Sequence, residues 1–240
     1  MIDFSILIPT RGRPALLRRC LESIRDTASN PGGVEILLYV DEDDFLTRAF
    51  SFPGLKILKC AGPRATLGEM PRVLEKSASG RNLFLFNDDA RILTAGWDEK
   101  MLRVLAPWPD GAALAWPRDP DRDGRLATFP CLPRTACALM GGIVPAPYRR
   151  HFSDNHVMDV FLRLRSLGHA RLAYAEDVLV DHMTYGEGLA ALEGEDASPG
   201  DEDDKLLFER LAPEREETAR RLAAHIRSRQ AAAGESSLLR

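Results

Sequence analysis

The residues best suited to chemistry are two adjacent carboxylates at the end of an apolar run. Residues 83–86 (LFLF) are followed at once by Asn87, Asp88 and Asp89. Four successive large apolar side chains point alternately to both faces of a strand, which predicts a strand covered on both sides, as in a parallel α/β sheet. Ligands of such sheets bind beyond the carboxyl ends of the strands, where a divalent cation such as Mg²⁺ or Mn²⁺ would neutralise the carboxylates and bind phosphate oxygens. A polar turn that caps the strand is the alternative.

A basic group follows the first apolar run, residues 4–9. Arg11 and Arg13 come directly after it, and Pro14 suits the first position of a helix predicted over residues 14–25. Arginines and free backbone N–H groups at a helix N-terminus favour an anion such as a diphosphate. Neither a G-x-G-x-x-G fingerprint nor a P-loop is present in the sequence. A basic, solvated loop is the alternative.

Acid also ends the second predicted strand, residues 34–40. That strand runs into Asp41, the first residue of an acidic stretch over 41–44. Asp41 is placed to accept hydrogen bonds from a nucleobase N–H or from ribose hydroxyls. Alternatively, the acidic stretch caps a short helix over residues 45–50.

The second half offers one acid and one histidine as candidate site residues. A helix is predicted over residues 153–167 with Ser153 or Asp154 as its N-cap, so that Asp154 lies at the mouth of the helix. A carboxylate there stays ionised and can act as a general base if it faces a cleft. Otherwise it is only the N-cap. His182 follows another apolar run and could complete an oxygen-rich metal site as a neutral imidazole, although a lone histidine is more often a polar surface residue.

The elements that must position these residues alternate along the first half of the chain. Strands and helices predicted in the order β-α-β-α-β-α-β indicate a parallel sheet with right-handed crossovers. The strand over 55–60 is short and edge-like, and a helix over 67–77 precedes the acidic strand.

Later elements are predicted more loosely. They are a helix from about 94 to 105, strands over 112–116, 129–138, 171–174 and 178–183, and a charged helix over 205–230 that Pro213 can divide into two. The segment 119–124 (DPDRDG) reads as a polar turn. It lacks the Glu that ends a calcium-binding EF-hand loop, which argues against calcium there.

Composition indicates an ordinary globular protein. The 240 residues are 45% hydrophobic and 28% charged, with a net charge of -4, which gives no general attraction to nucleic acid or to an anionic membrane. No apolar run approaches the roughly 20 residues of a spanning helix, and the N-terminus has no signal-peptide pattern. The four cysteines show no C-x-x-C spacing, which predicts free thiols in a reducing cytoplasm.

Five stretches of the sequence, in their order and spacing, resemble a family 2 glycosyltransferase with the GT-A fold. They are SILIPTRGRPALLRRCLESI, YVDEDD, FLFNDDARI with GWDEKML, DNHVMDVFLRLRSLGH and VLVDHM. The similarity covers about residues 3 to 185. It implies a single GT-A domain over 1–185 with a mainly parallel sheet. Beyond the resemblance, residues 186–204 are acidic and poor in large apolar residues, which predicts a flexible loop, and the charged helix gives a C-terminal helical extension over 205–240.

The resemblance also implies roles for individual residues. The nucleotide would lie near Pro9, Thr10, Arg11, Arg13 and Asp41, with Asp41 beside its base.

The acidic strand end corresponds to the D-x-D motif of the family, from which Asn87 departs. Asp89 and His182 would therefore hold the Mn²⁺ or Mg²⁺ ion, and Asp88 would contact the ribose or the sugar. Asp154 would deprotonate the acceptor hydroxyl, although the alignment also permits Asp159.

These roles imply a metal-dependent, hexosyltransferase-like enzyme that inverts the configuration of the transferred sugar. A UDP-sugar is favoured as donor, and the acceptor would be a glycan or another hydroxyl compound. Two alternatives stay open: a sugar-phosphate nucleotidyltransferase, and a non-catalytic nucleotide-sugar-binding protein, for which Asn87 is the best argument.

Overall fold

A computed structural model describes residues 1–144, 148–182 and 201–238 of the chain. The strands are β1 (Phe4–Thr10), β2 (Val34–Asp41), β3 (Lys56–Gly62), β4 (Asn82–Leu85), β5 (Ala90–Ile92), β6 (Leu114–Arg118), β7 (Cys131–Pro133) and β8 (Leu172–His182). The helices are α1 (Pro14–Thr27), α2 (Phe45–Ala49), α3 (Glu69–Ser77), α4 (Trp97–Leu105), α5 (Arg134–Met140), α6 (Ser153–Ser166), α7 (Asp201–Arg210) and α8 (Ala212–Leu238), with a 3₁₀ turn over Pro31–Gly33.

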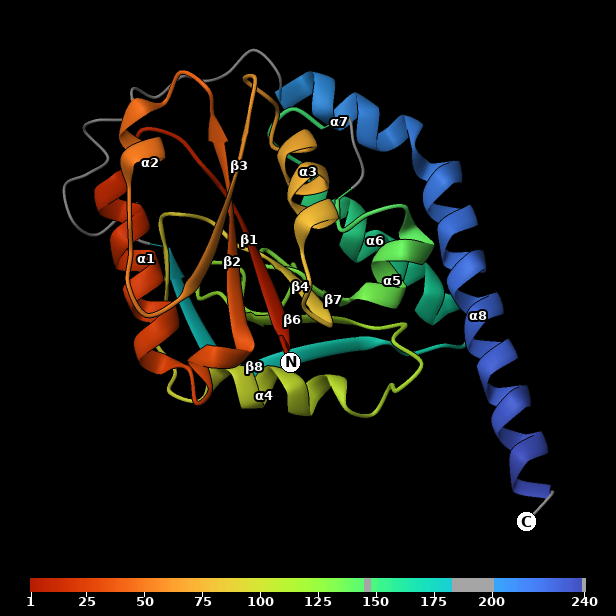
Figure 1. The fold of residues 1–240 in the computed structure, drawn as a ribbon. Helices are drawn as coiled ribbons and strands as arrows, with labels where there is room; N and C mark the ends of the chain where they lie inside the picture. The colour runs from red at the N-terminus through yellow and green to blue at the C-terminus, as the bar shows by residue number, and fades with distance from the viewer. Residues whose placement is uncertain (145–147, 183–200, 239–240) are drawn as a thin grey trace.

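The strands form one eight-stranded sheet in the order β3-β2-β1-β4-β7-β6-β8-β5, with helices on both faces (Figure 1). Strands β1 to β4 pair in parallel, and so do β6 and β8. Strand β7 is antiparallel to β4 and β6, and β5 is antiparallel to β8. The prediction of an α/β fold with a mainly parallel sheet is therefore confirmed.

The first half follows the predicted alternation closely, because each element there shows a clear hydrophobic period. All eight residues of β2 are buried, as expected of an inner strand covered on both faces. Strand β3 lies at the edge of the sheet, as its alternating pattern predicts, and several of its side chains are exposed.

Two strand predictions in the second half are wrong. The strand expected over 129–138 is only β7, because Pro133 supplies no N–H to a ladder and residues 134–140 turn into α5, which buries Ala136 and Cys137. The two strands expected over 171–174 and 178–183 are one strand, β8. It passes through the exposed Glu176 and Asp177 with a register shift against β6.

Two apolar clusters hold the helices to the sheet. The cluster on one face includes Leu17 and Ile24 of α1 and Trp97 of α4. The cluster on the other face draws on α3, α5, α6 and α8 and includes Phe161 and Leu222. Burial of such side chains supplies most of the stabilisation of the fold.

The C-terminal helix α8 is part of this core. The predicted break occurs near Pro213, which lies in the first turn of α8. Figure 1 shows α8 lying along one side of the molecule, where Ala219, Ala223 and Ile226 are fully or almost fully buried. Of the predicted loop over 186–204, residues 186–200 lie outside the described part of the chain, and residues 201–204 begin α7.

The four cysteines are free thiols, and three of them are buried. Among the residues that the structure describes, no helix is long and apolar enough to cross a membrane.

Candidate active site

The candidate site residues meet at one edge because of the strand directions. Strand β7 is antiparallel to both β4 and β6, so β1, β2, β4, β6 and β8 all point the same way. Residues that follow these strands therefore gather at the carboxyl edge of the sheet. This edge is where open α/β sheets bind their ligands.

The acids after β4 contact an arginine from the loop after β1. Arg13 Nη2 lies 2.6 Å from Asp88 Oδ1, and Arg13 Nη1 lies 3.3 Å from Asp89 Oδ2. Thr10 Oγ1 donates to Asp88 Oδ2 at 2.7 Å. Asp88 is only 1% exposed, so these contacts compensate a carboxylate that has lost almost all its water. Asp89 Oδ1 is buried and accepts no hydrogen bond from the described residues.

The other arginine of this loop contacts the acids after β2. Arg11 pairs with Asp41, and its guanidinium donates two hydrogen bonds to Asp43 at 2.8 and 2.9 Å. The hydrogen bonds that Arg11 donates to Asp43 and Asp41 raise the pKa of Arg11. Asp41 Oδ1 is buried and, within the described part of the chain, accepts no hydrogen bond.

Asp44 is a structural residue, as the alternative interpretation of the acidic stretch predicted. Its carboxylate accepts hydrogen bonds from the Thr47 N–H at 3.1 Å and from the Gly12 N–H at 2.7 Å. The first caps α2, and the second occupies a backbone donor that the sequence had suggested for an anion.

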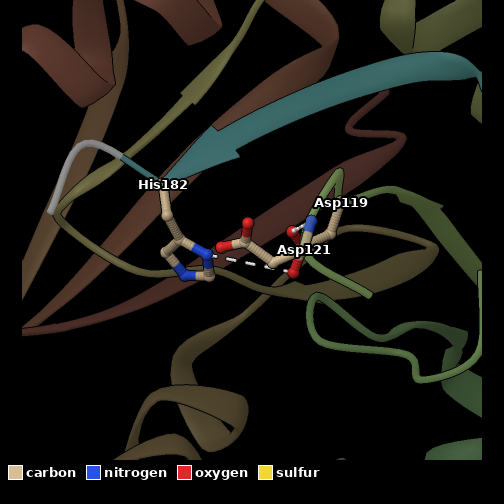
Figure 2. Close-up of side chains that lie close together, drawn as sticks. All are labelled: Asp119, Asp121 and His182. Carbon is tan, nitrogen blue, oxygen red and sulfur yellow. Dashed lines mark hydrogen bonds and ion pairs between the residues drawn. The ribbon is translucent and has the colours of Figure 1, made fainter. Parts of the chain in front are cut away.

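His182, the last residue of β8, lies beside two acids of the loop after β6. Figure 2 shows His182, Asp119 and Asp121 facing one another. Their candidate ligand atoms all lie within 4.8 Å of one another. His182 Nδ1 is 3.9 Å from Asp119 Oδ2, and the Asp121 N–H donates to Asp119 Oδ1 at 3.0 Å. We refer to these three residues as the Asp-Asp-His cluster. In the described residues it is the one group of three His, Cys, Asp or Glu side chains with this spacing.

Sequence reasoning missed Asp119 and Asp121. Both had been assigned to a polar turn, although they follow an apolar run just as Asp88 and Asp89 do. Their position after a strand was the available signal. The cluster borders the acidic end of β4, because Asn87 Nδ2 lies 3.1 Å from His182 Nε2. The Phe129 ring packs on the imidazole with centroids 4.8 Å apart, which restricts its orientation.

Asp154 lies in the first turn of α6. The N-cap is Phe152, so the prediction of Ser153 or Asp154 as N-cap is wrong. Burial raises the pKa of Asp154, and a hydrogen bond from the Asn155 N–H at 2.8 Å only partly offsets that rise. The effect of burial on this carboxyl therefore exceeds that of the helix N-terminus.

Asp159, the alternative base, makes structural contacts. It accepts hydrogen bonds from Arg163 Nε at 2.7 Å and from Arg215 Nε at 2.5 Å. Burial acts against its charged form, but these two arginines hold its pKa below the ordinary value. A carboxylate so paired accepts a proton poorly.

A cavity of about 410 Å³ joins the strand ends to the start of α6. Of the predicted site residues, it is lined by Pro9, Arg13, Asn87, Asp88, Asp89 and Asp154. Thr10, Arg11, Asp41 and His182 do not line it. The remaining lining residues include Thr128, Arg150, His151 and Ser153.

The sequence matches no known family model and no curated protein. The structure, however, is similar to the mannosyltransferase PcManGT from Pyrobaculum calidifontis, solved in complex with GDP-Man and Mn²⁺. The TM-score is 0.60 at 16% identity, over 99% of this chain and 81% of PcManGT. The chain has the GT-A glycosyltransferase fold.

Other GT-A structures agree. S. aureus TarS, residues 1–349, matches with a TM-score of 0.54 at 14% identity, over 76% of this chain and 61% of that fragment. The same protein in complex with UDP-GlcNAc matches with a TM-score of 0.53. Within this GT-A fold, the cavity and the Asp-Asp-His cluster share the carboxyl edge of the sheet, with Asn87 between them.

Proposed function

We propose that this chain transfers a glycosyl group from a nucleoside-diphosphate sugar to a hydroxyl acceptor, with inversion of configuration. The observation that carries the proposal is that Asp154 shares one cavity with Arg13, Asp88 and Asp89 on the GT-A fold. The acceptor oxygen forms a bond to the anomeric carbon, the bond from that carbon to the diphosphate oxygen breaks, and the acceptor proton passes to Asp154. One base and one leaving group suit a single displacement, which inverts the carbon.

The donor side of the cavity suits a diphosphate. Arg13 directs its guanidinium toward the strand ends, where it can donate to phosphate oxygens as it now donates to Asp88 and Asp89. Asp88, held by Thr10, would accept from a ribose or sugar hydroxyl. The unpaired oxygen of Asp41 would accept from a nucleobase N–H, for which uracil is our first choice. PcManGT carries GDP-Man and TarS carries UDP-GlcNAc, so guanine is the competing base.

A divalent cation fits the Asp-Asp-His cluster. Asp119 is 3% exposed, and the cluster offers two carboxylates and one imidazole. This mixed oxygen and nitrogen set favours Mn²⁺ over Mg²⁺, which prefers oxygen ligands. The ion would offset negative charge on the departing diphosphate. Titration of the chain with Mn²⁺, followed by water proton relaxation, should show one bound ion whose affinity rises with nucleoside diphosphate. Lack of binding with and without nucleotide would contradict this assignment.

The base assignment has a direct test. Asp154→Asn should lower kcat by about 10² to 10⁴-fold and leave nucleotide affinity unchanged, because only the proton acceptor is lost. Asp26→Asn, an exposed change on α1, is the matched control. Unchanged activity in Asp154→Asn would contradict the assignment of Asp154 as the base.

The pH profile gives a second readout. Transfer needs ionised Asp154, and burial raises its pKa, so activity should fall as pH drops through a value above the ordinary aspartate pKa of about 3.9. An acidic limb of the kcat profile at or below that value would argue against Asp154 as the base.

The donor can be identified by a thermal-shift screen of UDP, GDP, ADP and their sugars, each with and without Mn²⁺. At a hundredfold excess over Kd, the right ligand should stabilise the fold by about 2.7 kcal/mol, which corresponds to roughly 5 °C or more in Tm. No shift with any nucleotide would contradict the proposed function.

A non-catalytic nucleotide-sugar-binding protein is the second candidate. It is favoured by Arg13, which already contacts both carboxylates after β4. In that case a nucleotide sugar should bind, but no acceptor should yield product and Asp154→Asn should behave as the wild type. No contact of the described residues specifically favours a nucleotidyltransferase.

A further inference from the structure

The turn that leads into α6 holds an unusual backbone conformation. Phe152, directly before the helix, has φ 66°, one of two positive φ values at non-glycine residues of the described chain. A bulky side chain disfavours this conformation, so the surrounding structure must hold it in place. We refer to residues 148–152 as the 148–152 turn.

A single carboxylate of α7 binds the backbone of this turn. Asp204 accepts the N–H groups of Arg149 at 2.9 Å, Arg150 at 2.8 Å and His151 at 2.9 Å. Asp204 is 1% exposed. Burial alone would raise its pKa, but the three N–H donors hold that pKa below its ordinary value. Three convergent donors explain why a charged side chain is tolerated there.

The same helix also packs against the side chain of Phe152. The rings of Phe208 and Phe152 lie with centroids 5.5 Å apart. The guanidinium of Arg215, from α8, stacks on the Phe208 ring, with its Cζ 3.7 Å from the ring centroid. The Nε of Arg215 also donates a hydrogen bond to Asp159 of α6. The contacts from α7 and α8 thus reach both the turn and the helix that follows it.

The opposite side of the turn is fixed by the loop before α3. The N–H groups of Leu67 and Gly68 donate to the carbonyls of Arg149 and Tyr148, both at 3.1 Å. Gly68 is required there, because a Cβ atom would lie 2.6 Å from the Tyr148 carbonyl oxygen. The turn is therefore fixed between Leu67, which lines the cavity, and Asp204, which does not.

The 148–152 turn and the start of α6 line the part of the cavity in which the proposed base, Asp154, lies. Arg150 and His151 line the cavity from the turn itself, and Ser153 and Asp154 line it from the first residues of α6. We propose that Asp204 is a positioning residue of the transfer reaction: by fixing the backbone of the 148–152 turn, it sets where Asp154 meets the acceptor hydroxyl. The inference rests on the proposed function, because it requires Asp154 to act on the acceptor. It also gives the C-terminal helices a role in the reaction.

The test compares Asp204→Asn with Asp203→Asn. Asparagine keeps only one acceptor oxygen, so Asp204→Asn loses at least one of the three backbone bonds. We expect kcat to fall by about 10 to 100-fold, since misplacement of a reacting group by about 1 Å can cost 100-fold. Nucleotide affinity should stay within about twofold, because the residues of β1, β2 and β4 are untouched. Asp203 is exposed and pairs only loosely with Arg149, at 3.6 Å, so Asp203→Asn should keep full activity.

Backbone exchange gives an independent readout. Hydrogen–deuterium exchange at the amides of 149–151 should speed up in Asp204→Asn and not in Asp203→Asn. If Asp204→Asn does not fold, Phe208→Leu replaces it, because leucine keeps the apolar side of α7 but loses the ring contact with Phe152. The same split between kcat and nucleotide affinity is then expected.

Failures of the two proposals can be told apart. If the wild type is active and Asp154→Asn is not, but Asp204→Asn keeps wild-type kcat, the positioning role is wrong and the proposed function stands. If Asp204→Asn lowers kcat, nucleotide affinity and Tm together, Asp204 is only structural and the inference is overturned. If Asp154→Asn is fully active, the proposed function loses its base and this inference fails with it.

Discussion

At the carboxyl edge of the sheet, Asp88 and Asp89 contact an arginine of the same chain, whereas Asp119 and Asp121 lie beside a histidine. Both pairs follow a strand, and both could bind a cation by their chemistry. A guanidinium of the chain already offsets part of the negative charge of the first pair. Among the described residues, the side chain that faces the second pair is an imidazole, which can coordinate a metal but is a poor counter-ion when neutral. Acid at a strand end therefore predicts a cation, but neighbouring residues decide whether that cation is a metal or an arginine.

The largest expected effect comes from removing the arginine. Arg13→Gln removes a charged partner of the buried Asp88 and leaves that carboxylate beside a second one, Asp89. Loss of one partner of a buried ion pair costs 3–5 kcal/mol, and because Arg13 is 33% exposed we expect about 2 kcal/mol of lost stability. Chemical denaturation measures this loss, with the exposed Arg165→Gln as control.

This variant also sharpens the comparison. Without the guanidinium, the pair after β4 should itself bind a divalent cation, so Mn²⁺ should raise the Tm of Arg13→Gln more than that of the wild type. Equal Tm increases in both proteins would mean that the arginine does not keep a metal away from Asp88 and Asp89.

An intermediate effect is expected from the metal ligands. Loss of an outer-shell partner alone lowers metal affinity by 10 to 100-fold, so His182→Ala should weaken Mn²⁺ binding by at least about tenfold. Asp89→Asn should change it by less than about twofold, because Asp89 contacts Arg13 and lies outside the Asp-Asp-His cluster. Calorimetric titration with Mn²⁺ measures both. The reverse ranking would place the ion at the end of β4, as the family resemblance implies.

The smallest effect on stability is expected for the ion pair of Arg11, the other arginine of the loop after β1. Arg11 is 38% exposed and its partner Asp43 is 64% exposed, so their ion pair is screened by water. Asp43→Asn should lower stability by much less than Arg13→Gln does, and added salt should reduce the difference from the wild type further. If Asp43→Asn loses as much stability as Arg13→Gln, the difference in burial does not explain how much the ion pairs of Arg11 and Arg13 contribute.

The first half of the fold could be predicted because its information is local. Strands such as β1 and β2 are unbroken apolar runs, and α1 has a proline at its start and apolar residues on one face. The strand predictions were wrong where the local sequence pattern favours one structure and the tertiary contacts favour another. Residues 134–140 follow a strand-like stretch but form α5, and β8 continues through two charged residues because β6 pairs beside it.

The candidate site was predicted only in part. Asp154, Asp88 and Asp89 do line one cavity, as a shared cleft required. Asp119, Asp121 and Asp204 were missed, because each lies beside a group that is distant in sequence: His182 for the first two, and the 148–152 turn for the third.

The sequence by itself determined the class of the fold and the presence of acid and base at several strand ends, since periodicity and turn residues act over short distances. Only the tertiary structure decided which acids share a charge partner and which contact the cavity. Those outcomes depend on strand order, and the antiparallel β7 is what brings the ends of β6 and β8 to the same edge as β1 and β4. The interaction energy between two charges at that edge depends on distances of a few ångströms between elements. The spacing of residues along the chain does not determine those distances.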